Sequence, residues 1–402
     1  MGSDQVKIVT GLRRSGKTYL LFNLFKSYLL NNGYTPDQII EMSFDTFENI
    51  PYRDPNVFFP WVKEQIGDRG SCFVLLDEVQ LLGSFVEVLN SLIRTPGVDV
   101  YVTGSNAKLL SQDVITEFRG RGQEIRMRPL SFSEFYEGCD LDKRDAYEEY
   151  TTYGGLPAVA LCNSDEDKIE YLTNLFSETY IRDLIERNDV KDPTGLEELV
   201  DVLCSNISCL TNANKISNTF KSNQVDGMSP ATVSRYIEHV CNSFLFEKAL
   251  RYDIKGRKTI GASAKYYATD LGLRNARLNF RQVEETHLME NALYNELRGR
   301  GWGVDVGVVP VREASENGKM ARKQLECDFV CNKGSRRIYI QSAYALPDEE
   351  KWKQEQASLA NIDDSFKKVI VTKEGRKPFY NDRGILVMNV FDFMLNERSL
   401  EF

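Results

Sequence analysis

The residues with the clearest chemistry form one run near the start of the chain, Gly11-Leu12-Arg13-Arg14-Ser15-Gly16-Lys17-Thr18. The run fits G-x-x-x-x-G-K-[ST], a spacing in which successive backbone N–H groups surround a phosphate. The two glycines permit the tight curl, the lysine faces the β- and γ-phosphate oxygens, and the final hydroxyl is a magnesium ligand. We therefore expect ATP and Mg²⁺ to bind here, through Gly11, Arg13, Arg14, Ser15, Gly16, Lys17 and Thr18.

The elements on both sides of this loop have the patterns that it needs. Residues 6–10 are β-like, and residues 19–30 form an apolar run with helical spacing. Strand, loop and helix in this order are the context in which such a loop binds phosphate, with the start of the helix adding its unpaired N–H groups. The run at 19–30 is apolar nearly all round, which predicts a helix buried against a sheet.

A second pair of reactive side chains follows the apolar run Cys72–Leu76. Asp77 and Glu78 come at the end of what reads as a buried parallel strand, and the carboxyl ends of such strands point at the ligand. We expect Asp77 to hold the magnesium ion and Glu78 to polarise the attacking water. A glutamate at that position favours a hydrolase over a protein that only holds nucleotide.

Residues 98–103 repeat the pattern and deliver Ser105 and Asn106 to the same edge, where either could contact the γ-phosphate or orient water. Residues 39–45 read as another strand and residues 51–60 as a surface loop. Strands that alternate with helical runs predict an α/β fold with a doubly wound parallel sheet.

Arginines come next, among them Arg119 and Arg121. An NTPase needs such a group to neutralise charge on the transferred phosphoryl, either in cis or from a neighbouring subunit. For any one of them, a solvated surface arginine remains the alternative.

Several motifs in one order give a resemblance to a known family. They are the loop at 11–18, Leu-Leu-Asp-Glu-Val-Gln at 75–80, Thr-Gly-Ser-Asn-Ala-Lys-Leu-Leu at 103–110, Pro-Leu-Ser-Phe-Ser-Glu-Phe at 129–135 and Tyr-Gly-Gly-Leu-Pro at 153–157. From Lys7 to the C-terminus, the chain resembles prokaryotic AAA-type P-loop ATPases with a C-terminal domain of unknown function. The resemblance implies Asn106 as sensor and Arg121 in the arginine position. We also expect a homo-oligomer. Such proteins usually have a helical segment before the first strand, and only a handful of residues precede it here, so no adenine-contacting residues are assigned.

The middle of the chain has a different pattern. Three helical stripes, at 196–207, 214–220 and 230–244, precede two β-like runs at 246–254 and 265–269 that flank Lys255-Gly256-Arg257-Lys258. Three helices and a basic hairpin are the pattern of a winged helix-turn-helix, which the resemblance also implies.

The charge of this middle region differs from that of the whole chain. Residues 205–281 contain twelve Lys/Arg and five Asp/Glu, a net charge of +7 in a chain of net charge −9. A local excess of this kind is typical of nucleic-acid binding. We expect DNA contacts from Arg235 on the third helix and from Lys255, Arg257 and Lys258 on the hairpin. The alternative is a winged helix that only packs between domains.

The C-terminal part reads as helix, three strands, helix and two strands, which is the order of restriction-endonuclease-like folds and is also implied by the resemblance. The metal chemistry of that fold needs an Asp and then E-x-K on the next strand. Asp328 is present, and Glu290 could be an extra acid, but the E-x-K positions read Gln341-Ser342-Ala343. Alanine cannot replace the lysine, so we expect this site to be inactive.

Length and composition set the remaining limits. A chain of 402 residues with 42% hydrophobic and 27% charged residues is typical of a globular protein of two or three domains. No apolar run is long enough for a membrane helix, and the eight scattered cysteines with only two histidines predict neither disulfides nor a zinc site, so we expect a cytoplasmic protein. The expected parts are an ATPase core at 1–135, a helical lid or linker at 136–192, a winged helix at 193–282 and the nuclease-like domain at 283–402.

The resulting hypothesis is an ATP-hydrolysing switch whose nucleotide state controls the two C-terminal parts, which act on DNA. Three alternatives stay open. The first is an ATP-regulated, metal-dependent DNA nuclease, and the second is a nucleotide-gated adaptor that binds a protein and never contacts DNA. The third is a processive remodelling ring, which the sequence favours less because it shows no evident aromatic pore-loop signal.

Overall fold

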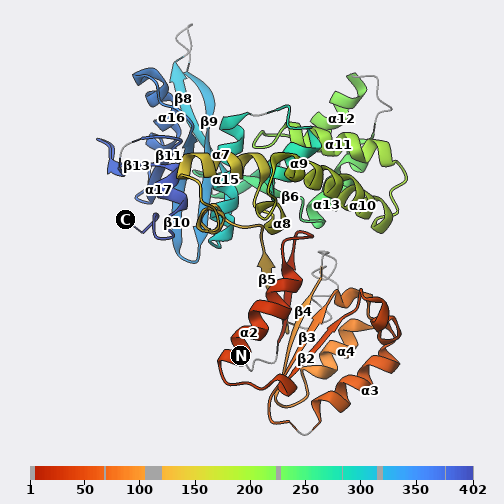
Figure 1. Ribbon diagram of the computed structural model, residues 1–402. Coiled ribbons are helices and arrows are strands. Elements are labelled where there is room, and N and C mark those ends of the chain that lie inside the picture. The colour runs from red at the N-terminus through yellow and green to blue at the C-terminus, as the bar shows by residue number, and fades with distance from the viewer. Residues whose placement is uncertain are drawn as a thin grey trace. The chain divides into compact units, whose positions relative to one another are not determined.

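The computed structural model describes residues 5–67, 69–104, 120–222, 228–282, 284–314, 320–375 and 377–401. The chain divides into two compact units (Figure 1). The first comprises Met1–Arg128 with Asn242–Phe244, and the second Pro129–Cys241 with Leu245–Phe402. The segments expected at 136–192, 193–282 and 283–402 thus fall almost wholly within one unit. Among the described residues, no helix combines the length and the apolarity that a membrane crossing requires.

The first unit is built on a parallel five-stranded sheet in the order β2-β3-β4-β1-β5. The central strands β1, β3 and β4 are buried along their whole length, which is why their sequences are continuous apolar runs rather than alternating ones. The predicted α/β fold with a parallel sheet is therefore confirmed. The strands are β1 (Val6–Gly11), β2 (Ile39–Ser43), β3 (Cys72–Asp77), β4 (Val98–Thr103) and β5 (Gly122–Met127).

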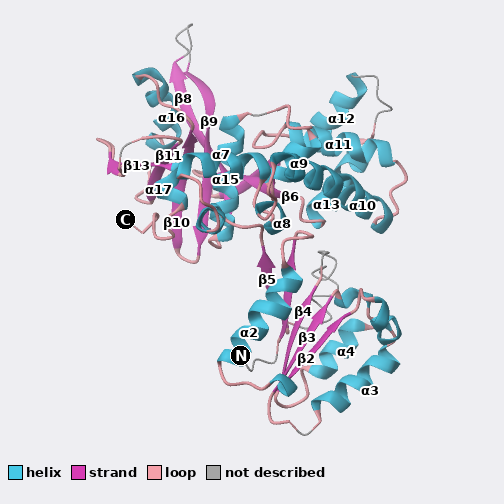
Figure 2. Ribbon diagram, in the orientation of Figure 1, coloured by secondary structure: helices cyan, strands magenta, loops and turns pink. Residues whose placement is uncertain are grey.

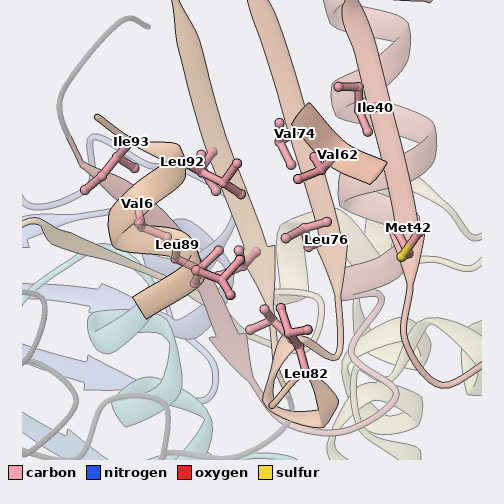
Figure 3. Packing of buried hydrophobic residues seen from close by; sticks show 14 of the residues in the cluster. Val6, Ile40, Met42, Val62, Val74, Leu76, Leu82, Leu89, Leu92 and Ile93 are labelled. Carbon is pink, nitrogen blue, oxygen red and sulfur yellow. The ribbon is translucent and has the colours of Figure 1, made fainter. Parts of the chain in front are cut away.

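Helices pack on both faces of this sheet. Alternate residues of β3 point to opposite faces, so Val74 and Leu76 pack against α3 (Pro55–Ile66) and α4 (Phe85–Leu92), as Figure 3 shows for part of this core. Phe73 and Leu75 pack on the other face against the helical segment that follows the loop. This segment consists of α1 (Lys17–Tyr19), η1 (Leu20–Phe25) and α2 (Lys26–Asn31).

One local prediction for this unit holds in part and another is wrong. The helical segment after the loop packs against the sheet as predicted, but its outer face is exposed, and Tyr19, Leu24 and Tyr28 are each more than half exposed. The predicted surface loop at 51–60 is largely helical: η3 covers Phe47–Arg53, and α3 begins at Pro55. Proline fits the first position of a helix, where its missing N–H needs no partner. Two further short 3₁₀ helices are η2 (Pro36–Gln38) and η4 (Val79–Leu81).

The second unit contains a mixed eight-stranded sheet in the order β12-β13-β11-β10-β9-β8-β6-β7 (Figure 2). The pairs β10·β11, β11·β13 and β6·β8 are parallel, and the other pairs are antiparallel. The strands are β6 (Phe246–Asp253), β7 (Lys258–Ala268), β8 (Gly303–Ala314), β9 (Met320–Lys333), β10 (Arg336–Ala343), β11 (Lys367–Thr372), β12 (Phe379–Tyr380) and β13 (Leu386–Asn389).

The helices of this unit fall before, between and after the strands along the chain. They are α6 (Phe132–Glu137), α7 (Lys143–Tyr153), α8 (Pro157–Ala160), α9 (Asp165–Asn174), η6 (Leu175–Ile181), α10 (Arg182–Arg187), α11 (Pro193–Ser205), α12 (Ala213–Ser222), α13 (Pro230–Asn242), α14 (Leu271–Arg277), α15 (Glu285–Gly299), α16 (Glu349–Ala360) and α17 (Val390–Met394).

The basic hairpin is present, but it differs from the prediction in two ways. Its second strand begins at Lys258 instead of Lys265, and its first strand pairs in parallel with β8 of the C-terminal sheet. The hairpin therefore supplies two strands of that sheet. Pairing between strands about fifty residues apart leaves no local sequence signal, which is why the sequence did not predict it.

The run Tyr153–Pro157 has a structural role in joining α7 to α14. The N–H of Gly155 donates to the carboxylate of Asp270 at 2.8 Å, and the N–H of Leu273 donates to the same carboxylate at 3.0 Å. A Cβ on Gly272 would lie 1.9 Å from the carbonyl oxygen of Tyr153. Burial raises the pKa of Asp270 to about 6, although the backbone N–H donors oppose this rise.

Candidate functional site

The predicted phosphate loop follows β1 at the carboxyl edge of the first unit's sheet. Gly11 has φ of 139°, and a Cβ there would lie 2.0 Å from the backbone oxygen of Met127 on β5. Gly16 has φ of 95° and begins the helical segment. Both positions therefore require glycine, and at Gly11 the close approach of β5 is an additional reason that the sequence did not reveal.

Two buried polar side chains lie inside the loop. The ammonium of Lys17 donates to the carbonyl oxygens of Gly11 and Leu12, at 3.1 and 2.9 Å. The hydroxyl of Ser15 is buried and has no hydrogen-bond partner. A buried polar atom without a partner is costly unless a ligand satisfies it. The loop residues thus fit a phosphate group, which is an acceptor for both side chains.

The two arginines of the loop differ in environment. Arg13 is half-buried, whereas Arg14 is exposed and has φ of 65°, a backbone conformation that is uncommon for a residue with a side chain. Their predicted role in binding ATP stays a prediction.

The carboxylate of Asp77 is the centre of a hydroxyl network at the ends of three strands and the start of a helix. One oxygen accepts from the hydroxyl of Thr18 at 2.9 Å and from that of Ser43 at 3.1 Å. The other accepts from the hydroxyl of Thr103. Asp77 is 3% exposed, so these hydroxyls replace the water that would otherwise solvate it. Carboxylate and hydroxyl oxygens are the ligands that Mg²⁺ prefers, so the chemistry of Thr18 and Asp77 fits this ion.

Glu78 is placed beside this network by an unusual backbone. Its φ is 52°, in the left-handed region, and its N–H donates to the hydroxyl of Thr103 at 3.2 Å. Its carboxylate accepts a hydrogen bond from the amide of Gln80. Strained conformations of this kind cost about 1–3 kcal/mol and cluster at functional sites. The backbone of Glu78 is therefore joined to the network through Thr103, while the role of its carboxylate in orienting water stays a prediction.

Three residues of this site were missed at the sequence level. Ser43 and Thr103 are the last residues of β2 and β4, and Gln80 lies two positions after Glu78. In a parallel sheet, the residues that end neighbouring strands meet at one edge. The sequence signal that could have found these residues is therefore a polar residue at the end of each apolar run. This signal points to Thr103 as well as to residues 105 and 106.

Two other predicted catalytic residues are not placed at this site. Asn106, and with it Ser105 and Arg119, lies outside the described residues. The backbone oxygen of Arg121 accepts from the N–H of Val6, at the amino end of β1, whereas the loop follows its carboxyl end. A six-residue strand spans roughly 17 Å, which exceeds the reach of an arginine side chain. A role for Arg121 at its own subunit's nucleotide is therefore wrong, and action on a neighbouring subunit stays a prediction.

The predicted nucleic-acid contacts are all on the surface. Arg235 on α13 and the hairpin-turn residues Lys255, Arg257 and Lys258 are exposed. Burial leaves the local excess of positive charge close to what the sequence suggested, because it removes cations and acids alike. Lys265 and Arg274 are buried, but so are the acids Glu247 and Asp270, and the partly exposed Arg277 forms ion pairs with Glu197 and Asp201.

The predicted remnant of a nuclease site is only partly assembled. Glu290 on α15 and Asp328 on β9 come together, but the group between them is the ammonium of Lys265 from β7. Gln341 contacts α16 instead: its oxygen accepts from the Ser358 hydroxyl at 3.1 Å and its amide donates to Glu355 at 3.4 Å.

Burial, with the neighbouring carboxylate of Glu290, raises the pKa of Asp328 above its ordinary value, although the ammonium of Lys265 opposes this rise. Burial alone would lower the pKa of Lys265, but the surrounding carboxylates outweigh this effect and raise it. The described residues contain no group of three or more His, Cys, Asp or Glu side chains arranged to hold a metal ion.

Two family models match the chain, and together they cover most of its first 284 residues. A family model described as an AAA domain matches residues 3–136, and a model described as a domain of unknown function, DUF8612, matches residues 144–284. An AAA domain followed by a domain of unknown function agrees with the resemblance that the sequence motifs gave.

Relatives and solved structures were also found. An uncharacterized protein of Methanocaldococcus jannaschii is 25% identical over 409 residues, which cover 97% of this chain and 85% of the relative. Among solved structures, Cdc6p of Pyrobaculum aerophilum has 10% identity and a TM-score of 0.26, with 72% of this chain and 88% of that one covered. ORC1 of Aeropyrum pernix, in complex with DNA, has 12% identity and a TM-score of 0.27, with 68% and 86% covered. Scores this low support no conclusion about function.

The similarity to an uncharacterized protein of Haemophilus influenzae is higher and extends along both chains. The two are 33% identical over 400 residues, which cover 98% of this chain and 95% of the relative. The chain therefore belongs to the family of AAA-domain proteins that includes this Haemophilus influenzae protein.

Proposed function

We propose that this protein binds and hydrolyses Mg-ATP and that its nucleotide state controls how the second unit engages DNA. The observation that carries the ATPase part is the hydrogen-bonded chain from the hydroxyl of Thr18 through Asp77 and Thr103 to the backbone of Glu78. It joins the loop, the predicted metal ligand and the predicted base in one network. Free cysteines at all eight positions agree with a cytoplasmic location.

Each residue of the network has a defined task in this proposal. The loop from Gly11 to Thr18 binds the phosphates, and Lys17 neutralises charge on their oxygens. Thr18 and Asp77 would hold Mg²⁺, which supplies further neutralisation when bound. Glu78 orients the water that attacks the γ-phosphorus; the bond to the β-phosphate oxygen breaks, and ADP and phosphate leave.

The first test is the ATP hydrolysis rate with and without DNA. We expect Lys17→Ala to abolish hydrolysis, because it removes the cation that faces the phosphates, and we expect DNA to raise the wild-type rate. Lys26→Ala is the matched control. Lys26 lies on the same helical segment, but its side chain is partly exposed and forms an ion pair with Glu41. A measurable ATP hydrolysis rate that does not change when DNA is added would favour a nucleotide-gated adaptor that binds protein. An Lys17→Ala variant that hydrolyses ATP normally would contradict the ATPase assignment.

The DNA part rests on the exposed cations of the hairpin turn, and it has its own test. The double variant Arg257→Ala/Lys258→Ala should bind DNA more weakly, because it neutralises fewer phosphates and so releases fewer counterions. The slope of log K against log salt should become shallower by about 0.9 for each phosphate that the variant no longer neutralises. Affinity is measured by fluorescence anisotropy over a range of salt concentrations.

The control for this measurement is Lys351→Ala/Lys353→Ala. It removes the same charge from α16, where both lysines pair with glutamates of their own helix. An unchanged slope in the hairpin variant, or wild-type protein that does not bind DNA, would contradict a DNA-binding role for the hairpin.

A further inference from the structure

The acidic cluster of the second unit already contains a cation, the ammonium of Lys265. Its Nζ lies 2.8 Å from Glu290 Oε1, 2.8 Å from Glu326 Oε1 and 3.4 Å from Asp328 Oδ1. The lysine side chain is 3% exposed, and those of Glu290 and Asp328 are 9% exposed. Three carboxylates from two separate elements thus surround one buried positive charge.

The surrounding backbone holds the cluster in this geometry. Between the pairs Asp305·Val330 and Gly307·Cys327, one residue of β8 is opposite two residues of β9, so β9 has a bulge at Asp328 and Phe329. A bulge redirects the side chains that it contains. The backbone N–H of Ser342 fixes the second oxygen of Asp328 at 2.9 Å, and the hydroxyl of Tyr267 donates to Glu290 Oε1 at 2.8 Å.

The position that a divalent metal would need is therefore taken. Such an ion requires several carboxylate oxygens around one point, and the point that these oxygens share is the ammonium. The lysine comes from β7, whereas nuclease chemistry would need it at position 343, which is Ala343 on β10. Gln341, the other expected ligand, contacts α16. The residues present do not fit a metal-dependent nuclease site.

We propose that Lys265 is a built-in cation that replaces a divalent metal in this cluster, so that the C-terminal domain acts without nuclease chemistry. The ammonium offsets part of the negative charge of the acids and joins the hairpin strand β7 to α15 and β9 by ion pairs. Removal of the ammonium leaves the three carboxylates of Glu290, Glu326 and Asp328 around an empty point. That point becomes a site for a divalent cation in the variant. This proposal is independent of ATP hydrolysis.

The test compares thermal unfolding of the full chain in EDTA and in Ca²⁺, without nucleotide. Calcium takes oxygen ligands at about 2.3–2.6 Å and tolerates irregular geometry. The carboxylate oxygens of this cluster therefore need to move inward less for Ca²⁺ than for the smaller Mg²⁺. The Tm of the wild type should not respond to Ca²⁺. The Tm of Lys265→Ala should fall in EDTA and rise by roughly 5–10 °C when Ca²⁺ exceeds its Kd a hundredfold.

Two variants identify the site of this response. Lys265→Ala/Asp328→Asn should lose the gain, because a carboxylate ligand is missing. Lys248→Ala removes an exposed lysine from the same hairpin and should respond like the wild type. A folded Lys265→Ala protein without a calcium response would overturn the proposal.

If Lys265→Ala does not fold, measurements on the wild type and on Asp328→Asn still test the proposal. The proposal is overturned if Ca²⁺ raises the Tm of the wild type and Asp328→Asn removes this rise. It is equally overturned if the wild type cuts DNA with Mg²⁺ or Mn²⁺ and Asp328→Asn abolishes the cutting. The proposal is supported if neither the wild type nor the Asp328→Asn variant changes its Tm with the metal and neither cuts DNA.

Discussion

Replacing Glu78 by glutamine is expected to lower kcat for ATP hydrolysis by about 10²–10⁴-fold, the usual contribution of a positioned general base. Glutamine keeps the size of the side chain and can still contact Gln80, but it cannot take a proton from water. The N–H of residue 78 still donates to Thr103, so the backbone and the fold should be preserved and the loss assigned to the carboxylate. Binding of ATP should change little, because the loop and Asp77 are intact.

Single-turnover hydrolysis and fluorescent-nucleotide binding measure the two effects separately. Glu87→Gln is the matched control, because it makes the same chemical change on the exposed side of α4. An unchanged kcat in Glu78→Gln would remove Glu78 from the mechanism. Equal losses of binding and hydrolysis would instead indicate a structural role for this carboxylate.

The second large effect is expected at Gly272, where alanine should destabilise the second unit by roughly 3 kcal/mol or more. The added Cβ would lie 1.9 Å from the carbonyl oxygen and 2.3 Å from the carbonyl carbon of Tyr153. Both atoms belong to the backbone at the end of α7, so no side-chain rotation can relieve the overlap. The helices α7 and α14 must separate, and the buried hydrogen bonds of Asp270 weaken with them.

Thermal or urea unfolding of the full chain measures this loss. For a domain of this size, a change of about 3 kcal/mol corresponds to a fall in Tm of roughly 6–12 °C. Gly138→Ala is the control in the same unit, since a Cβ there would make only ordinary contacts, at 3.6 Å to Phe135 and 3.7 Å to Glu134. A Gly272→Ala protein as stable as this control would show that the two helices can move apart at no cost.

The sequence alone was sufficient where the chemistry depends on neighbours in the chain. The glycine spacing, Lys17 and Thr18 identified the loop, and the apolar run before Asp77 identified a buried strand that ends at the same edge. These signals are local, because a phosphate loop is made by consecutive backbone N–H groups and a buried strand by consecutive apolar side chains. The alternation of such strands with helices then predicted the parallel sheet.

The tertiary structure decided which distant residues meet. Thr103 contacts Asp77 because β3 and β4 are neighbouring parallel strands that end at the same edge. Arg121 is far from its own loop because β5 runs parallel to β1 and begins at its amino end. Lys265 was counted in the sequence among cations for DNA, yet it is buried among carboxylates of α15 and β9. The sequence does not distinguish a charged side chain that is exposed from one that is buried. Only the long-range pairing of strands determines which of the two environments it occupies, and here that pairing separated the exposed cations of the hairpin turn from the buried one that follows them on β7.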